Sequence, residues 1–248
     1  MIKIENIVTP SPEQWRATIL GARNAMNSWA RSDSVICTDR ETCEDCPCND
    51  GNGCRERGLD PFVIGPNDYD LMMRLRNAGK DHRKYMRMLH VYMNITAPLY
   101  WWKEFDTYKI GTTANSCSTM HKIHAKEFVL EDFSHEKLII VDDSNAINRW
   151  NYGCDPVLPI GILEIVIREL NFLRDKFLET KDKRYWDCMI QLLPTSYNQM
   201  RTVELNYEVL ANIYPARKTH KLTEWHELCD VIERLPYSEF ITGKVKEE

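Results

Sequence analysis

The residues between Pro98 and His121 combine aromatic, charged and hydroxyl side chains in a way that a fold alone does not require. An aromatic run at Tyr100, Trp101 and Trp102 comes first, and hydroxyl and amide side chains are frequent from Thr112 to Thr119. Aromatic faces supply flat apolar walls, and hydroxyl and amide groups supply oriented hydrogen bonds. The stretch therefore predicts a pocket for a planar polar ligand. The alternative is an amphipathic helix with a solvated polar face, followed by a loop.

A second group with chemical potential is a cysteine cluster in a polar stretch. It consists of Cys37, Cys43, Cys46, Cys48 and Cys54. Cys43 and Cys46 have the spacing that places two thiolates on one metal ion, and the other members can complete a tetrahedron. A zinc site and free thiols are both compatible with the pattern, and a cytosolic chain disfavours disulfides.

The remaining chain supplies strands and helices that position these groups. Alternating apolar residues predict strands at 2–8 and 90–97, and helical spacing predicts helices at 15–27, 67–78, 160–180, 185–193, 197–213 and 222–235. This order is poor in strands and ends in long helices, so it favours an α+β domain with a small antiparallel sheet. We expect one domain over 1–248, with the cysteine-rich stretch at about 37–58 as an insertion.

Composition and charge limit the functional classes. The net charge of −5 argues against binding to a nucleic-acid polymer, because such binding depends on phosphate neutralisation. A nucleotide monophosphate needs only one or two local cations. No apolar run approaches the ~20 residues of a membrane span, and the first residues lack the apolar core of a signal peptide, so we expect a cytoplasmic protein.

The Pro98–His121 stretch resembles the core motif of the flavin-dependent thymidylate synthases. That family has a strand ending in Ala-Pro, a helix, an Arg-His-Arg triplet and a Ser-x-Asn-x-x-Ser-x-Arg-Tyr loop. Here Ala97-Pro98 is kept and Glu104 replaces a Gln of the family. Thr107-Tyr108-Lys109 falls on the triplet. After one extra residue, Asn115 and Ser118 match the loop, whereas Met120 and His121 replace its Arg and Tyr.

Two further stretches resemble the same family. His82 precedes Pro98 by the expected distance and falls on a histidine that the family places beside the flavin. After Leu193-Pro194, an ungapped count reaches Asn206, Asn212 and Arg217, which fall on residues that contact flavin and nucleotide. Glu208 stands where the family often has an arginine. The chain is thus similar to a divergent member of the family, with fewer basic residues in the motif.

The resemblance implies a fold, an activity and ligands. It implies one-carbon transfer to carbon 5 of a pyrimidine deoxynucleotide, with FAD as cofactor and with NADPH and methylene-tetrahydrofolate as co-substrates. It also implies a homotetramer, because the family assembles its flavin sites from several subunits. The implied cofactor-binding residues are His82, Lys109, Asn115, Asn206 and Asn212, and the implied substrate-binding residues are Glu104, Ser118, His121 and Arg217.

The departures from the family pattern leave alternatives open. The chain can be an active enzyme, a homologue that binds flavin and nucleotide without catalysis, or an interaction protein that uses its cysteine-rich insertion. The substrate is also open. We rank dUMP first, but Glu104, Asp106 and Glu208 add carboxylates, which accept hydrogen bonds from an exocyclic amine and so favour a deoxycytidylate.

Overall fold

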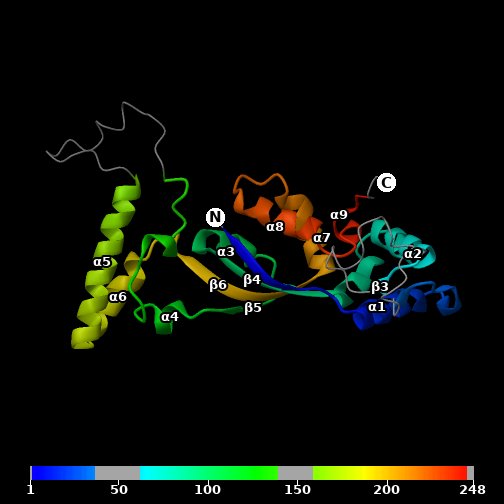
Figure 1. Cartoon of the computed structure of the whole chain (residues 1–248), viewed down its shortest axis with the longest axis horizontal. Coiled ribbons are helices and arrows are strands. Elements are labelled where there is room, and N and C mark those ends of the chain that lie inside the picture. The colour runs from blue at the N-terminus through cyan, green and yellow to red at the C-terminus, as the bar shows by residue number, and fades with distance from the viewer. Residues whose placement is uncertain (1, 37–61, 139–158, 245–248) are drawn as a thin grey trace, which may run out of the picture. The chain divides into compact units, whose positions relative to one another are not determined.

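The structure is a computed structural model that describes residues 2–36, 62–138 and 159–244. These residues form an α+β fold with a small antiparallel sheet and many helices, so the predicted fold class is confirmed. The main strands are β1 (Lys3–Val8), β4 (His90–Pro98), β5 (Thr113–Ser116) and β6 (Asn198–Asn206), in the spatial order β1-β4-β6-β5 (Figure 1). Strands β2 (Val35–Ile36) and β3 (Phe62–Val63) form a separate antiparallel pair.

The helices carry most of the described chain. They are α1 (Pro12–Asn24), α2 (Pro66–Asn77), α3 (Leu99–Phe105), α4 (Thr119–Lys122), α5 (Pro159–Thr180), α6 (Lys183–Leu192), α7 (Tyr207–Arg217), α8 (Glu224–Glu233) and α9 (Glu239–Thr242). Short 3-10 helices are η1 (Trp29–Arg31), η2 (Arg83–Met88) and η3 (Leu130–Asp132). Helix α1 begins with a capping box, in which Ser11 and Gln14 each accept a hydrogen bond from the other's backbone N–H.

The predicted helix over 197–213 is wrong in its first half. Residues 198–206 form β6, and only the residues from Tyr207 onward are helical. Val203 and Leu205 are fully buried and alternate with more exposed neighbours, which is the period of a strand. The loop expected before Thr119 likewise contains β5. Strand pairing therefore overrides the helical spacing of the apolar residues here.

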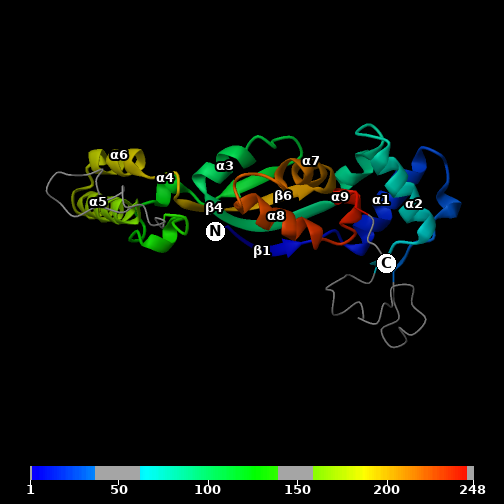
Figure 2. The same cartoon turned by 90° about the horizontal axis from the view of Figure 1, so that it is seen from above.

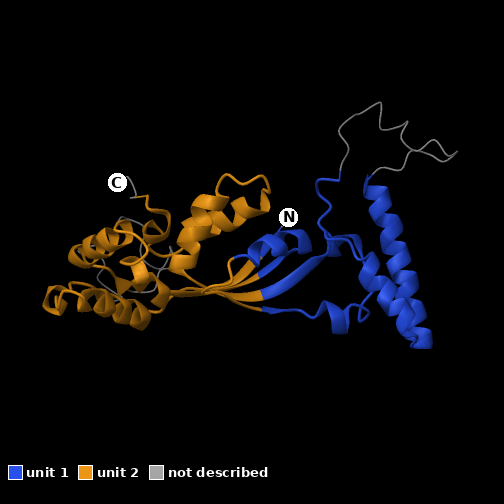
Figure 3. Ribbon diagram, turned by 180° about the vertical axis from the view of Figure 1, so that it is seen from behind, with its two compact units in different colours: residues 1–3, 95–107, 115–201 blue, residues 4–94, 108–114, 202–248 orange. Residues whose placement is uncertain are grey.

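Contacts divide the chain into two compact units (Figure 3). The first comprises Met1–Lys3, Ile95–Thr107 and Asn115–Arg201, and the second comprises Ile4–Asn94, Tyr108–Ala114 and Thr202–Glu248. The chain passes from one unit to the other within β4 and within β6. The division does not test whether the chain is one domain, so the single domain over 1–248 stays a prediction.

Each unit has its own apolar core. In the first unit, α5 and α6 lie side by side in both views (Figure 1 and Figure 2), and their buried faces share a cluster with Phe128 and Phe133. In the second unit, Trp15 of α1 is 2% exposed and makes edge contacts with Tyr207 at 5.6 Å and Tyr237 at 5.2 Å. These aromatic contacts fix α1 and the start of α7 within the second unit.

Candidate functional site

Asn206 lies at the junction of β6 and α7 in the second unit, and its side chain is 6% exposed. Its Oδ1 accepts a hydrogen bond from the Val209 N–H at 3.0 Å, which caps α7, and its Nδ2 donates to the Gly111 carbonyl at 3.4 Å. Gly111 has a φ of +76°, and an added Cβ would lie 2.9 Å from Nδ2 of Asn206. The glycine therefore permits this close approach, and the amide keeps one N–H beyond these bonds.

Two arginines of η2 surround Glu208, which lies on α7. Arg87 donates hydrogen bonds to the Glu208 carboxylate, and Arg83 Nε lies 3.6 Å from its Oε1. Arg83 Nη2 also donates to Oδ1 of Asn212 at 2.7 Å. The Nε of Arg83 is buried and makes no hydrogen bond to any described residue. Two arginines thus meet one carboxylate, which leaves the cluster positive, and exposed His82 immediately precedes it in sequence.

Arg217 is held between aromatic rings at the end of α7. Its guanidinium carbon lies 4.3 Å from the centroid of the Trp225 ring and 5.4 Å from that of Tyr108, and its Nε donates to the Tyr108 hydroxyl at 2.9 Å. Stacking and the hydrogen bond fix the plane of the guanidinium, which suits it to bidentate recognition of an oxyanion or a base edge. Lys109 follows Tyr108 and is exposed.

The predicted loop residues lie in the first unit. Ser118 caps the short α4 by accepting a hydrogen bond from the His121 N–H at 3.0 Å, so its oxygen is partly occupied. A shallow groove of about 270 Å³ is lined by Ser118, Thr119 and Gln199, among others. The Nε2 of Gln199 donates to the Cys117 carbonyl and to Thr119 Oγ1, both at 2.9 Å. These bonds attach the segment after β5 to β6.

Arg201 is a functional candidate that the sequence analysis missed. Its guanidinium lies 4.2 Å from the centroid of the Trp102 ring, and it pairs with Asp106 at 2.7 Å and donates to Gln199 Oε1 at 3.0 Å. The alternation along β6 places Gln199 and Arg201 on one face, which is a signal that a helical interpretation of 197–213 hides.

Two carboxylates that the sequence analysis treated as negative charge near the nucleotide have arginine partners. Glu208 pairs with Arg87, and Asp106 pairs with Arg201. Glu104 is half-buried on α3, and Asn115 is exposed on β5.

The sequence-predicted site residues are divided between the units. His82, Lys109, Asn206, Asn212 and Arg217 belong to the second unit, and Glu104, Asn115, Ser118 and His121 belong to the first. Within the second unit the structure gathers Asn206, Asn212 and Arg217 on or beside α7. Within the first, it joins Ser118 to His121 through the cap of α4.

The cysteines of the predicted metal site, Cys37, Cys43, Cys46, Cys48 and Cys54, lie outside the described residues. Within residues 2–36, 62–138 and 159–244, no group of three or more His, Cys, Asp or Glu side chains has the arrangement of a metal site. In the same ranges, no helix has the length and apolar content needed to cross a membrane.

Comparison with solved structures shows what this fold is similar to. A crystal structure of thymidylate synthase X (ThyX) from Helicobacter pylori with FAD and dUMP matches over 100% of both chains, with a TM-score of 0.58 and 15% sequence identity. A second complex of the same enzyme with FAD and dUMP covers 99% of both chains, with a TM-score of 0.58 and 16% identity. No protein-family model and no curated protein sequence matches this chain. At this identity the comparison shows that the chain shares the fold of flavin-dependent thymidylate synthases.

Proposed function

We propose that this chain is a divergent flavin-dependent thymidylate synthase, which binds FAD and a pyrimidine deoxynucleotide and transfers a one-carbon unit to carbon 5 of the base. The observation that carries the proposal is the full-length similarity to two ThyX structures that contain FAD and dUMP. The spacing of Asn206, Asn212 and Arg217 along one element supports it independently, because all three lie on or beside α7. NADPH and methylene-tetrahydrofolate are the proposed co-substrates, and the proposed location is the cytoplasm.

The second unit contains polar groups that fit a flavin dinucleotide. Asn206 has an amide N–H beyond its capping bonds, and Asn212 is exposed with its oxygen held by Arg83. Among the described residues, neither the buried Arg83 Nε–H nor the buried Thr112 hydroxyl oxygen beside Gly111 makes a hydrogen bond, although Arg83 Nε lies 3.6 Å from a Glu208 oxygen. Buried polar atoms without partners are costly, so an outside ligand that supplies partners gains affinity here. We assign His82, Lys109, Asn206 and Asn212 of the second unit to the flavin, and Asn115 of the first unit by the resemblance alone.

The surplus positive charge near Glu208 suits the diphosphate of FAD. Arg83 and Arg87 supply two cations, and the Glu208 carboxylate neutralises one of them. Diphosphates are bound by such clusters through charge-assisted hydrogen bonds. The family's arginine at position 208 is thereby replaced by arginines from η2, so the loss of a basic residue from the motif does not remove positive charge from this unit.

We assign Glu104, Ser118, His121 and Arg217 to the nucleotide. Arg217 presents a fixed fork of donors, because Trp225 and Tyr108 hold its plane. Ser118 keeps its hydroxyl hydrogen for a phosphate or base oxygen, since it acts only as an acceptor toward His121. When bound, reduced flavin supplies the hydride for the reductive step. The residues of this chain orient the base and hold the phosphate. The reacting groups are thereby held in a geometry that lowers the entropic part of the barrier to transfer.

The ion pairs also favour dUMP over a deoxycytidylate. The case for a cytosine base rested on Glu104, Asp106 and Glu208 as acceptors for an exocyclic amine. Two of these carboxylates are engaged by Arg201 and Arg87. We therefore propose dUMP as the substrate, with dCMP as the competitor to be measured beside it.

Release of tritium from carbon 5 of dUMP tests this proposal, because the new carbon–carbon bond replaces that hydrogen. We expect release that requires FAD, NADPH and methylene-tetrahydrofolate together. Arg217→Ala should raise the KM for dUMP at least about tenfold through loss of a charged donor, whereas Arg217→Lys restores only part of it. Lys218→Ala is the matched control, because Lys218 pairs with Asp230 and Glu233. Binding of FAD and dUMP without release would identify an inactive homologue.

A further inference from the structure

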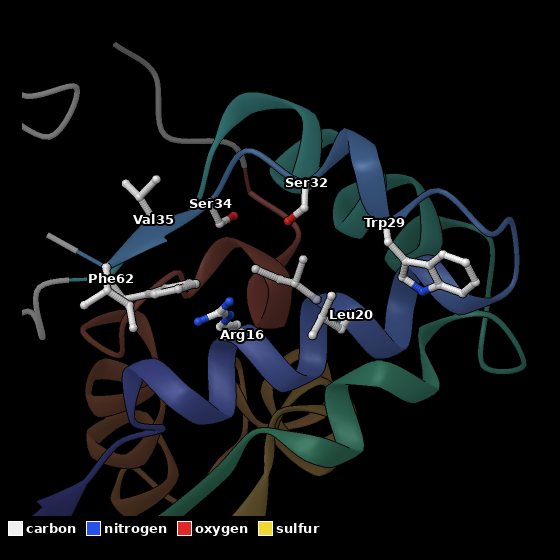
Figure 4. Close-up of a pocket in the computed structure, with 9 residues that line it drawn as sticks. Arg16, Leu20, Trp29, Ser32, Ser34, Val35 and Phe62 are labelled. Atoms are coloured by element: carbon white, nitrogen blue, oxygen red, sulfur yellow. The ribbon is translucent and has the colours of Figure 1, made fainter.

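The second unit contains a further pocket, between α1 and residues 29–36 (Figure 4). Its volume of about 490 Å³ lies within the range of small-molecule sites. Its described lining includes none of the residues assigned above to flavin or nucleotide. The pocket therefore requires an explanation of its own.

Arg16 supplies the charge of this pocket. It is the one charged side chain among the described residues that line it. Arg16 makes no hydrogen bond or ion pair with any described residue, and it projects from α1 toward the pocket beside Leu20 (Figure 4). An arginine in a concave site without a carboxylate partner is suited to a ligand oxyanion, which it binds through two parallel hydrogen bonds.

The walls of the pocket are apolar and exposed. Leu20 is 42% exposed, Trp29 48% and Val35 56%, although each is a large apolar side chain. The indole N–H of Trp29 donates to Asn24 Oδ1 at 2.8 Å, which orients the ring and uses its only donor. The walls therefore offer flat apolar contact to a ligand ring without competing for its polar groups.

The hydrogen bonds of Ser32 and Ser34 determine whether a ligand must supply a donor or an acceptor. Both hydroxyls donate to Oδ2 of Asp68, Ser32 at 2.8 Å and Ser34 at 2.6 Å. Burial alone would raise the pKa of Asp68, but hydrogen bonds from Ser34, Ser32 and Arg23 lower it, so the carboxylate is ionised and only accepts. The serine hydrogens are thus committed, and the Ser34 oxygen also accepts from the Gly65 N–H at 3.1 Å. The hydroxyl oxygens can therefore only accept from a ligand, and Ser32 has the more available oxygen.

We propose that this pocket binds a small aromatic carboxylate that also carries an O–H or N–H donor. The carboxylate pairs with Arg16, the ring packs against Leu20 and Trp29, and the donor bonds to the oxygens of Ser32 or Ser34. The three requirements come from three separate features of the pocket. A ligand that lacks any one of them loses affinity.

Calorimetric titration with three related probes tests the proposal. The probes are para-hydroxyphenylacetate, its neutral amide, and para-methoxyphenylacetate, which lacks the donor. We expect the hydroxy acid to bind with a Kd of about 1 mM or tighter. The amide and the methoxy acid should each bind at least about tenfold more weakly. The indole N–H resonance of Trp29, assigned by its loss in Trp29→Phe, should shift at lower concentrations of the hydroxy acid than of the other two probes.

Variants complete the test. Arg16→Gln should remove the difference between acid and amide, whereas Arg31→Gln, a control at an exposed arginine of η1 outside the pocket lining, should preserve it. Arg16 is exposed, so the variant is expected to fold, and an unchanged Tm verifies this. Equal affinity for acid and amide, equal affinity for the methoxy acid, or no binding of any probe would each overturn the proposal.

Discussion

At the scale of single residues, the structure contains three arginines outside the family motif that are candidates for binding anions. Arg83 and Arg87 lie on η2, and Arg201 lies on β6. Each has an acidic partner, but Glu208 serves two arginines, so the cluster around Glu208 keeps a positive surplus. The family motif read along the sequence reveals the missing basic residues but not these three arginines, because they become neighbours of the motif only in the folded chain.

Asp68 joins a buried arginine to two serines in the second unit. Its carboxylate is fully buried and accepts hydrogen bonds from Arg23, Ser32 and Ser34. We expect Asp68→Asn to lower the free energy of unfolding by about 3–5 kcal/mol, because Arg23 keeps a buried charge without its partner. Urea unfolding measures the change. Asp70→Asn on the same helix is the control, since its pair with Arg74 is exposed, and a loss of similar size there would contradict the account.

The pH dependence follows from the same group. Hydrogen bonding lowers the pKa of Asp68 in the folded protein below its ordinary value of 3.8, despite its burial. A group with a lowered folded pKa stabilises the protein above its unfolded pKa and loses that contribution as the pH falls through the folded pKa. The wild-type protein should therefore lose stability below about pH 4, and Asp68→Asn should show a flatter acid limb.

At the scale of elements, the segment before α7 shows what the sequence could predict and what it could not. Asn206 was predicted as a site residue from its spacing, and the structure places it at a helix start. The extent of the helix was wrong, because Met200, Val203 and Tyr207 also have helical spacing. This segment forms a strand because it contains the β-branched pair Thr202-Val203 and because it pairs with β4. A local sequence pattern does not reveal such a pairing partner.

Substitutions at Asn206 separate its two roles. Asn206→Asp keeps an oxygen that caps α7 but loses the amide donor to the Gly111 carbonyl, so we expect most of the stability to be retained and FAD affinity to fall about tenfold. Asn206→Ala removes the cap as well and should also lower the free energy of unfolding by about 1 kcal/mol. Thermal unfolding and FAD titration give the two readouts. Equal FAD affinity in all three proteins would remove Asn206 from the flavin site.

At the scale of the whole molecule, the α+β class was predictable from periodicity, whereas the division into two units was not. Apolar spacing records which face of an element is buried, and it does not record the element against which it packs. The first unit draws together residues from Ile95 and from Arg201, which are distant in sequence. Its residues Gln199 and Arg201 were missed for the same reason.

We predict a homotetramer, because the resembled family assembles its flavin sites from several subunits. Light scattering at tens of micromolar should give four times the chain mass of 29.2 kDa. Dimers would require a different assembly of the sites. A monomer at that concentration would contradict the proposal that several subunits together form the flavin sites.

The cysteine cluster should be peripheral to catalysis. We predict that it binds one zinc ion or stays reduced, and elemental analysis distinguishes the two. Replacing Cys43 and Cys46 by Ser should lower the Tm more than it lowers FAD affinity, because a structural metal contributes to folding. Cys188→Ser is the control at an exposed free thiol. Loss of turnover with intact fold and flavin content would contradict a peripheral role.

Flavin binding followed by nucleotide binding tests the central claim most directly. The purified chain is titrated with FAD by absorbance, and the loaded protein is then titrated with dUMP and with dCMP by calorimetry. The account predicts an FAD Kd of about 100 µM or tighter and a preference for dUMP that Arg217→Ala weakens. Absence of FAD binding at high micromolar concentration, or dUMP affinity that is unchanged by Arg217→Ala, would contradict it.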